Sequence, residues 1–136
     1  MEMCEVRVFV VYGSGQVAAR VILELQRVPS VRFVGQSQDD TVTIAAIRSS
    51  QPDAVLFVGP HLEALTLRQI FAGLREINPT PRILLMTDYS FVQYKKEGMR
   101  MGADHVFETT NEFQGMIDLF REDRITNDPD PERGLA

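Results

Sequence analysis

Short apolar runs alternate with longer amphipathic segments five times along this chain of 136 residues. The first run, residues 6–11, is apolar except for Arg7, which is typical of a strand buried on both faces of a sheet. Residues 14–27 follow with apolar side chains at helical spacing, and Pro29 ends that helix. Further strands are predicted at residues 31–36, 54–58, 82–87 and 104–107, and further helices after Asp40, over 62–77, over 90–101 and after Asn111.

This alternation predicts a parallel sheet with helices on both faces. The common solution at this chain length is the flavodoxin-like (βα)5 doubly wound α/β fold, with strand order 2-1-3-4-5. In such folds ligands bind at the carboxyl ends of the strands, so the residues there are the candidates for function. They are Tyr12 and Gly13, Val58 and Gly59, Thr87 and Asp88, and Glu108 and Thr109.

The charge balance restricts the class of partner. The formal net charge is −5 and the sequence pI is about 5.0, which argues against nucleic acid because that partner requires a basic face. We see no signal peptide and no run that approaches the roughly 20 apolar residues of a membrane span, so no membrane association is expected. Cys4 is the single cysteine and cannot form an internal disulfide, which fits a cytoplasmic protein. The sequence assigns no role to Cys4.

Several short motifs stand in a set order around the predicted strands. They are Pro29-Ser30-Val31-Arg32-Phe33-Val34-Gly35, Pro52-Asp53, Met86-Thr87 and Gly102-Ala103-Asp104. From Val6 to about Arg121 the chain thereby resembles the receiver domain of two-component response regulators, of the chemotaxis-regulator type. The resemblance supports the flavodoxin-like fold and implies a role in signal transduction.

A receiver-like domain is therefore expected over residues 1–122. After Arg121 the chain turns polar and contains Pro129 and Pro131, so residues 123–136 are expected to form a disordered tail. That tail is too short and too acidic for a DNA-binding domain. We therefore expect the output to be another protein or a homodimer.

The chain departs from the family at the residues that carry phosphotransfer. Receivers place the phosphoryl-accepting aspartate at the end of the third strand, where this chain has Val58. The two acidic residues that help to bind magnesium correspond to Tyr12 and Gly13. Thr87 keeps the hydroxyl of the fourth strand, whereas Thr109 replaces the family's lysine. The resemblance thus implies a degenerate phosphorylation pocket.

These losses are physically consistent with one another. A hard divalent cation needs carboxylate oxygens, and Tyr12, Gly13 and Val58 supply none. A lysine at position 109 would then lack its partners, and breaking such a buried pair costs about 3–5 kcal/mol. The alternative is a shifted register that hides the true acids, for which the nearest carboxylates are Asp39, Asp40, Asp53 and Asp88.

The predicted helix over residues 90–101 carries more apolar side chains than one stripe along a sheet requires. Its apolar residues are Phe91, Val92, Tyr94, Met99 and Met101, and its basic residues are Lys95, Lys96 and Arg100. The surplus can simply cover the sheet edge. In receivers, however, the face of the fourth helix, fifth strand and fifth helix is the usual contact surface. We therefore predict a partner interface that contains Phe91, Tyr94, Arg100 and Val106, the last at the family's aromatic switch position.

A second motif competes with this interpretation. The run Gly13-Ser14-Gly15-Gln16-Val17-Ala18 matches G-x-G-x-x-[GA], the dinucleotide-binding pattern, between a strand and a helix. That pattern also needs an acid near the end of the second strand, where Gln36 and Ser37 stand. A simpler role is a tight turn in which Ser14 caps the helix. The alternative function is therefore a small nucleotide- or anion-binding module that uses Gly13–Gly15.

No catalytic pattern emerges from the remaining residues. His61 and His105 lack companions at metal-ligand spacing, and no Ser-His-Asp or Cys-His arrangement can be assembled. We therefore expect no enzyme activity, no metal and no cofactor. The sequence predicts an atypical single-domain response-regulator-like protein that acts by phosphorylation-independent protein–protein interaction.

Overall fold

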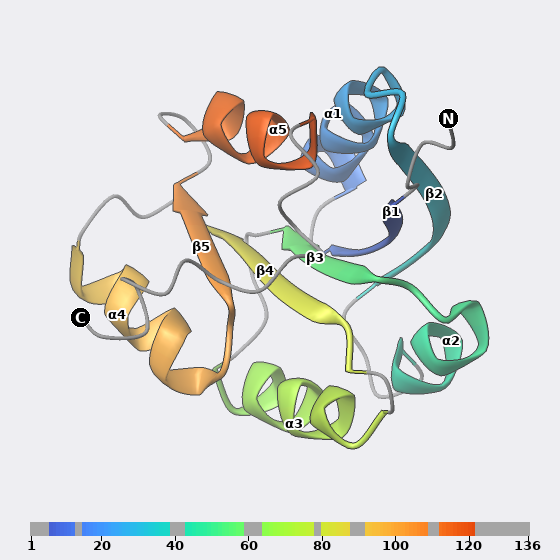
Figure 1. Cartoon of the computed structure of the whole chain (residues 1–136). Coiled ribbons are helices and arrows are strands. Elements are labelled where there is room, and N and C mark those ends of the chain that lie inside the picture. The colour runs from blue at the N-terminus through green and yellow to red at the C-terminus, as the bar shows by residue number, and fades with distance from the viewer. Residues whose placement is uncertain are drawn as a thin grey trace.

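The computed structural model describes residues 6–12, 15–38, 43–58, 64–77, 80–87, 92–108 and 112–121. Strands and helices alternate strictly through these ranges (Figure 1). The strands are β1 (Val6–Tyr12), β2 (Val31–Gln38), β3 (Ala54–Val58), β4 (Arg82–Thr87) and β5 (His105–Glu108). The helices are α1 (Gly15–Gln26), α2 (Thr43–Ser50), α3 (Ala64–Arg75), α4 (Val92–Met101) and α5 (Phe113–Arg121).

The sheet has the order β2-β1-β3-β4-β5, and all neighbouring strands are parallel. This arrangement confirms the flavodoxin-like fold predicted from the sequence. Helices α1 and α5 lie on one face of the sheet, and α2 and α3 lie on the other (Figure 1). Helix α4 lies beside β5, at the edge of the sheet.

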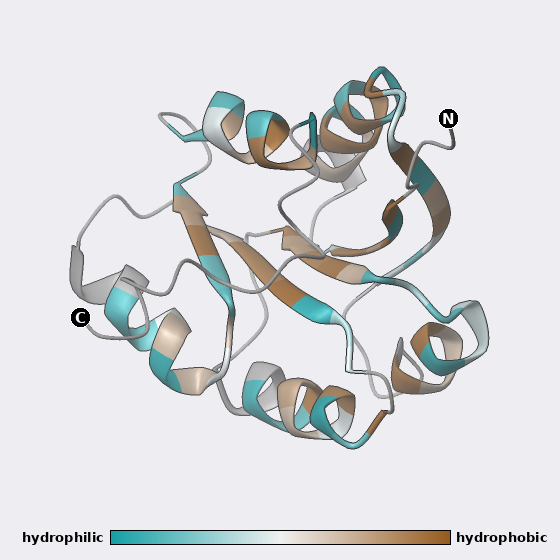
Figure 2. Ribbon diagram, in the orientation of Figure 1, coloured by the Kyte–Doolittle hydropathy of each residue, from teal (hydrophilic) through white to brown (hydrophobic). Residues whose placement is uncertain are grey.

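Two hydrophobic clusters, one on each face, hold the layers together. Alternate residues of a central strand enter opposite clusters: Val8 and Val10 of β1 pack toward α1 and α5, whereas Phe9 and Val11 pack toward α2 and α3. All five residues of β3 are buried. Figure 2 shows the same pattern, with brown strands in the interior and teal on the outer surfaces of the helices. Burial on both faces explains why these strands read as continuous apolar runs.

Helix α4 approaches the sheet most closely at Gly98. A Cβ atom built there would lie 2.8 Å from Cγ2 of Val106 and 3.1 Å from Cδ2 of Leu85. A larger residue would therefore push the helix away from β4 and β5. The consequence for the predicted interface is that Val106 lies partly buried beneath α4.

The observed ends of the elements differ from the predicted ones by one or two residues. Strands β3 and β4 match their predictions, whereas β1 and β2 run one and two residues further. Strand β5 spans residues 105–108 instead of 104–107, because Asp104 hydrogen-bonds to Ile83 and precedes the ladder. Helix α3 ends at Arg75, two residues before the predicted end.

Some sequence predictions fall outside the described residues. These are the helix caps at Asp40, Ser90 and Asn111 and the tail at residues 123–136. Within the described ranges, no helix combines the length and the apolar character that crossing a membrane would require.

Candidate functional site

The carboxyl ends of β1, β3 and β4 meet at the predicted degenerate phosphorylation pocket. Tyr12 of β1 is in register with Val58 of β3, and Val58 is in register with Met86 of β4. Val58 is only 3% exposed and belongs to the apolar cluster beneath α1 and α5. Tyr12 is partly buried against the same cluster. At Val58 this edge is therefore apolar and offers neither a nucleophilic oxygen nor a charge.

The structure describes only some of the five residues of the predicted pocket. The structure brings Tyr12 and Val58 side by side, and Thr87 ends β4 at the same edge of the sheet. Nothing is described of the Thr87 side chain, and Gly13 and Thr109 lie outside the described residues. The composition of the whole pocket remains a prediction.

Glu108 is the one charged residue classed as buried among those the structure describes. It ends β5, in register with Thr87, and it is 6% exposed. Its backbone N–H donates to Oε1 of Glu112 at 2.9 Å, and the N–H of Glu112 donates to its carbonyl oxygen at 2.9 Å. These two bonds tie the end of β5 to the residue that precedes α5. They give Glu108 a structural position that the sequence did not indicate.

Among the described residues, this edge holds no set of ligands that fits a magnesium ion. Glu108 lies two strands from Val58, which corresponds to about 10 Å across the sheet. One carboxylate at that distance cannot complete a coordination sphere around a cation next to Val58. In the described part of the chain, no group of three or more His, Cys, Asp or Glu residues is placed to hold a metal ion.

The acidic residues of the family-like motifs lie at the opposite edge. Oδ2 of Asp53 accepts a hydrogen bond from the N–H of Arg7 at 2.9 Å, before β3 begins. The Arg7 guanidinium donates to the carbonyl oxygens of Ser50 and Gln51. Oδ2 of Asp104 accepts from the N–H of Ile83 at 2.8 Å. These carboxylates fasten strand beginnings together, so Asp53 cannot be the hidden acid of a shifted register. Asp39, Asp40 and Asp88 lie outside the described residues.

The predicted partner interface is also described only in part. Arg100 is exposed on α4, with 73% of its side chain accessible, and Val106 is half-buried beneath Gly98. Phe91 lies outside the described residues, and nothing is described of the Tyr94 side chain. The interface therefore remains a prediction.

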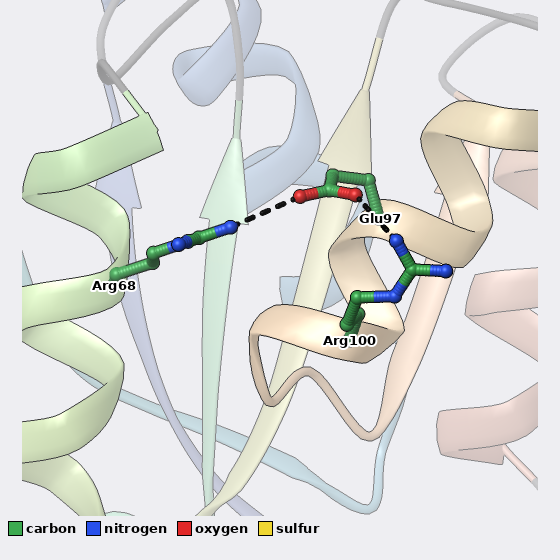
Figure 3. Close-up of polar contacts among 3 residues, drawn as sticks. All are labelled: Arg68, Glu97 and Arg100. Carbon is green, nitrogen blue, oxygen red and sulfur yellow. Dashed lines mark hydrogen bonds and ion pairs between the residues drawn. The ribbon is translucent and has the colours of Figure 1, made fainter.

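Arg100 belongs to a cluster that sequence reasoning missed (Figure 3). Glu97 accepts a hydrogen bond from Nη2 of Arg68 at 3.1 Å and another from Nη1 of Arg100 at 3.3 Å. Figure 3 shows the Glu97 carboxylate between the two guanidiniums, with Arg68 reaching across from α3. The i,i+3 spacing of Glu97 and Arg100 could be read from the sequence. The contact of Arg68 from α3 could not, because it depends on how the two helices pack.

Most of the alternative site at the start of α1 lies outside the described residues. Helix α1 begins at Gly15, as a G-x-G turn would require, but Gly13 and Ser14 are not described. Gln36, which stands where a dinucleotide site needs an acid, is exposed on β2. Nucleotide or anion binding thus stays an alternative prediction.

No protein-family model and no curated protein matches the chain. Solved structures do match. The receiver domain of the putative response regulator NarL from Mycobacterium tuberculosis is similar, with a TM-score of 0.74, 20% identity, and coverage of 91% of this chain and 98% of that one. A LuxR-family response regulator from Aurantimonas sp. matches with a TM-score of 0.73 and 16% identity, and the match covers 96% of this chain and 94% of that one. The response regulator domain of CheB from Thermotoga maritima matches with a TM-score of 0.67 and 19% identity, and the match covers 92% of this chain and 99% of that one. The chain therefore has the fold of a response-regulator receiver domain.

Proposed function

We propose that this protein is a signalling protein of the response-regulator type that acts by protein–protein contact without being phosphorylated. The observation that carries the proposal is the buried Val58, in register between Tyr12 and Met86 at the edge where receivers place the acceptor aspartate. A valine side chain has no atom that can attack phosphorus, and its apolar surroundings disfavour a cation. We propose neither an enzyme activity nor a cofactor, and we propose that the protein acts in the cytoplasm.

The packing of Val106 supports a contact surface with a single conformation. Its short β-branched side chain has few rotamers and lies against Gly98 of α4. In receivers an aromatic residue at this position changes orientation with the state of the pocket. Val106 cannot reproduce that movement, so the face of α4 and β5 would bind its partner at all times. Control would then pass to expression of the protein or to the state of the partner.

Phosphorylation can be tested directly by intact mass. The protein is incubated with acetyl phosphate and magnesium, or with beryllofluoride and magnesium, next to a receiver that has its aspartate. We expect the mass, the oligomeric state and the thermal stability of this protein to stay unchanged while the control responds. A stoichiometric phosphoryl adduct on an aspartate would overturn the proposal. Stabilisation by nucleotides in the same thermal assay would favour the alternative module at Gly13–Gly15.

The interface is tested by association of the protein with itself or with a captured partner. We expect Tyr94→Ala to cost about 2 kcal/mol or more of association, a loss of about thirtyfold in affinity, if Tyr94 is an anchor. Arg100→Glu should weaken the same complex. The control is Leu23→Ala, which removes an exposed apolar side chain from α1 (52% exposed). Loss of binding in the control alone would move the interface to the face of α1 and α5.

A further inference from the structure

The seam between α3 and α4 carries a basic surface on an acidic protein. Among the described side chains of α3, α4 and the adjoining residue 76, four exposed cations stand against two carboxylates. The cations are Arg68, Arg75, Lys96 and Arg100, and the carboxylates are Glu76 and Glu97. The whole chain has a formal net charge of −5, so the seam has the sign opposite to the rest of the molecule. Such a surface attracts an acidic ligand.

The seam cations are held in place by bonds between the two helices. Glu97 on α4 accepts a hydrogen bond from Arg68 on α3, which joins the two helices, and another from Arg100 on α4 (Figure 3). Nη2 of Arg75 donates to the carbonyl oxygen of Gly102, at the end of α4. Each guanidinium carries five N–H donors, so most donors of Arg68 and Arg100 remain for a further ligand. Prepositioned guanidiniums of this kind suit carboxylates, which they can bind in a bidentate manner.

Residues 122–136 of this chain have the complementary charge. They contain five carboxylates against two arginines. Asp128, Asp130 and Glu132 alternate with Pro129 and Pro131. A residue that precedes proline favours extended backbone, so the sequence spaces successive carboxylates about 6 Å apart along the chain. Arg68 and Arg75 are two helical turns apart, about 10 Å, which places several such carboxylates within reach of the seam.

The segment starts at the correct edge of the molecule. Helices that connect parallel strands run back against the strand direction, so α3 and α4 end at the amino edge of the sheet. Helix α5 ends there too, because Oγ of Ser30, next to the start of β2, donates to the carbonyl oxygen of Phe120. Arg121 ends α5 there, and Arg75 and Arg100 lie in the last turns of α3 and α4. Residues 128–132 are seven to eleven residues beyond Arg121, a reach of up to about 25–35 Å. The domain itself is only about 35 Å wide.

We infer that residues 122–136 dock onto the α3–α4 seam of the same chain, through Asp128, Asp130 and Glu132. A tether of this length gives an effective concentration on the order of millimolar, so even a weak contact is substantially occupied. Because Arg100 also belongs to the predicted partner interface, the docked segment covers part of that surface. An acidic segment of a partner must then displace it. The docking itself goes beyond the proposed function and does not require it.

The lysines of the chain offer a direct test, since Lys95 and Lys96 are the only two and both lie on α4. A carbodiimide, which joins an amine to a carboxylate at zero length, is applied to the full chain, and the products are mapped by peptide mass. We expect the major lysine crosslinks to join these lysines to the carboxylates at 128–132. At 0.5 M salt the attraction between charges is largely screened beyond about 5 Å, so the yield of these crosslinks should fall several-fold.

A matched pair of variants separates attraction from mere proximity. Arg68→Glu with Arg100→Glu leaves both reacting groups in place and should lower the crosslink yield by about tenfold. Arg20→Glu with Arg27→Glu makes the same change of charge with two exposed arginines, one in α1 and one directly after it, and should leave the yield unchanged. Circular dichroism checks that both variants fold. Equal yields in the two variants would overturn the inference, as would the absence of crosslinks to 128–132.

A second copy of the chain is the competing occupant, and isotope mixing identifies it. Equal amounts of unlabelled and ¹⁵N-labelled protein are mixed before crosslinking. Docking within one chain gives crosslinked peptides that are wholly light or wholly heavy at all protein concentrations. Light–heavy pairs in the crosslinks between α4 and residues 128–132 would show exchange between copies and would refute docking within the chain.

Discussion

The two edges of the sheet differ in chemistry. At the amino edge, Asp53 and Asp104 accept hydrogen bonds from the backbone of Arg7 and Ile83, and a guanidinium fastens the loop before β3. At the carboxyl edge, Tyr12, Val58 and Met86 meet across three strands with apolar packing. The amino edge holds the strands in register, whereas the carboxyl edge is the place where this fold class does chemistry.

The difference teaches which residues of a family pattern belong to the fold and which belong to the reaction. Asp53 and Asp104 belong to the fold, because they accept hydrogen bonds from part-buried backbone N–H groups where the strands begin. Val58 marks the opposite case, since a buried strand end tolerates valine without loss of packing. A chain can therefore keep this fold with a valine at the end of β3.

The strongest way to break the comparison is to place a carboxylate at Val58, in the apolar part of the carboxyl edge. We expect Val58→Asp to lower the free energy of unfolding by about 3–5 kcal/mol at pH 8, because the new charge would be buried without a partner. Burial raises the pKa of the new carboxyl above its unfolded value, so the loss should shrink as the pH falls towards 4. Denaturant titrations at the two pH values measure both effects.

The control for this variant is Val58→Asn, which has nearly the same shape and no charge. It should show a smaller loss that does not vary between pH 4 and pH 8 beyond the wild-type dependence. If Val58→Asp is as stable as wild type at pH 8, then other groups stabilise a carboxylate at this edge. The description of the site as apolar would then be wrong.

At the amino edge the matching experiment removes a carboxylate instead of adding one. We expect Asp53→Ala to cost about 1–3 kcal/mol, because the N–H of Arg7 loses its acceptor at a part-buried position. Asp53→Asn keeps a side-chain oxygen and should cost less. Equilibrium denaturation of the three proteins measures the series. A neutral Asp53→Ala would show that the carboxylate does not contribute to holding β1 and β3.

Asp104→Ala tests the same idea one strand further out. Its Oδ2 accepts from Ile83, but β5 is an edge strand and the local structure can relax more easily. We therefore expect a loss of about 1–2 kcal/mol, at the lower end of the range for an unsatisfied donor. Amide hydrogen exchange at Ile83 should accelerate by more than that of the amides in β3. Unchanged protection at Ile83 would contradict this assignment.

The fold could be predicted from the sequence because burial on both faces leaves a plain pattern. Strands β3 and β4 have the predicted bounds, since every residue of β3 is buried and β4 is nearly as apolar. The end of β5 was misplaced by one residue because hydrogen bonds of Asp104 and Glu108 define it, and apolar periodicity does not record them. The strand order followed from the number of strand–helix units.

The candidate site was predictable only where it is local in sequence. Val58 follows Pro52-Asp53 at a set distance, so its place at the edge could be read directly. The cluster of Arg68, Glu97 and Arg100 could not, because Arg68 and Glu97 are 29 residues apart and meet through the packing of α3 against α4. That packing depends on the close approach of Gly98 to Val106 of β5, which a sequence pattern does not record.

The smallest expected effect concerns the phenol of Tyr12. If the carboxyl edge contributes through apolar packing alone, the ring of Tyr12 matters and its hydroxyl does not, because the side chain is only partly buried against the cluster. Tyr12→Phe should then change the free energy of unfolding by about 0.5 kcal/mol or less, whereas Tyr12→Ala should cost clearly more. Both are measured by denaturation in the same buffer. A loss of more than about 1 kcal/mol in Tyr12→Phe would reveal a hydrogen bond of that hydroxyl and a polar network at this edge. The contrast between the two edges would then weaken at the position next to Val58.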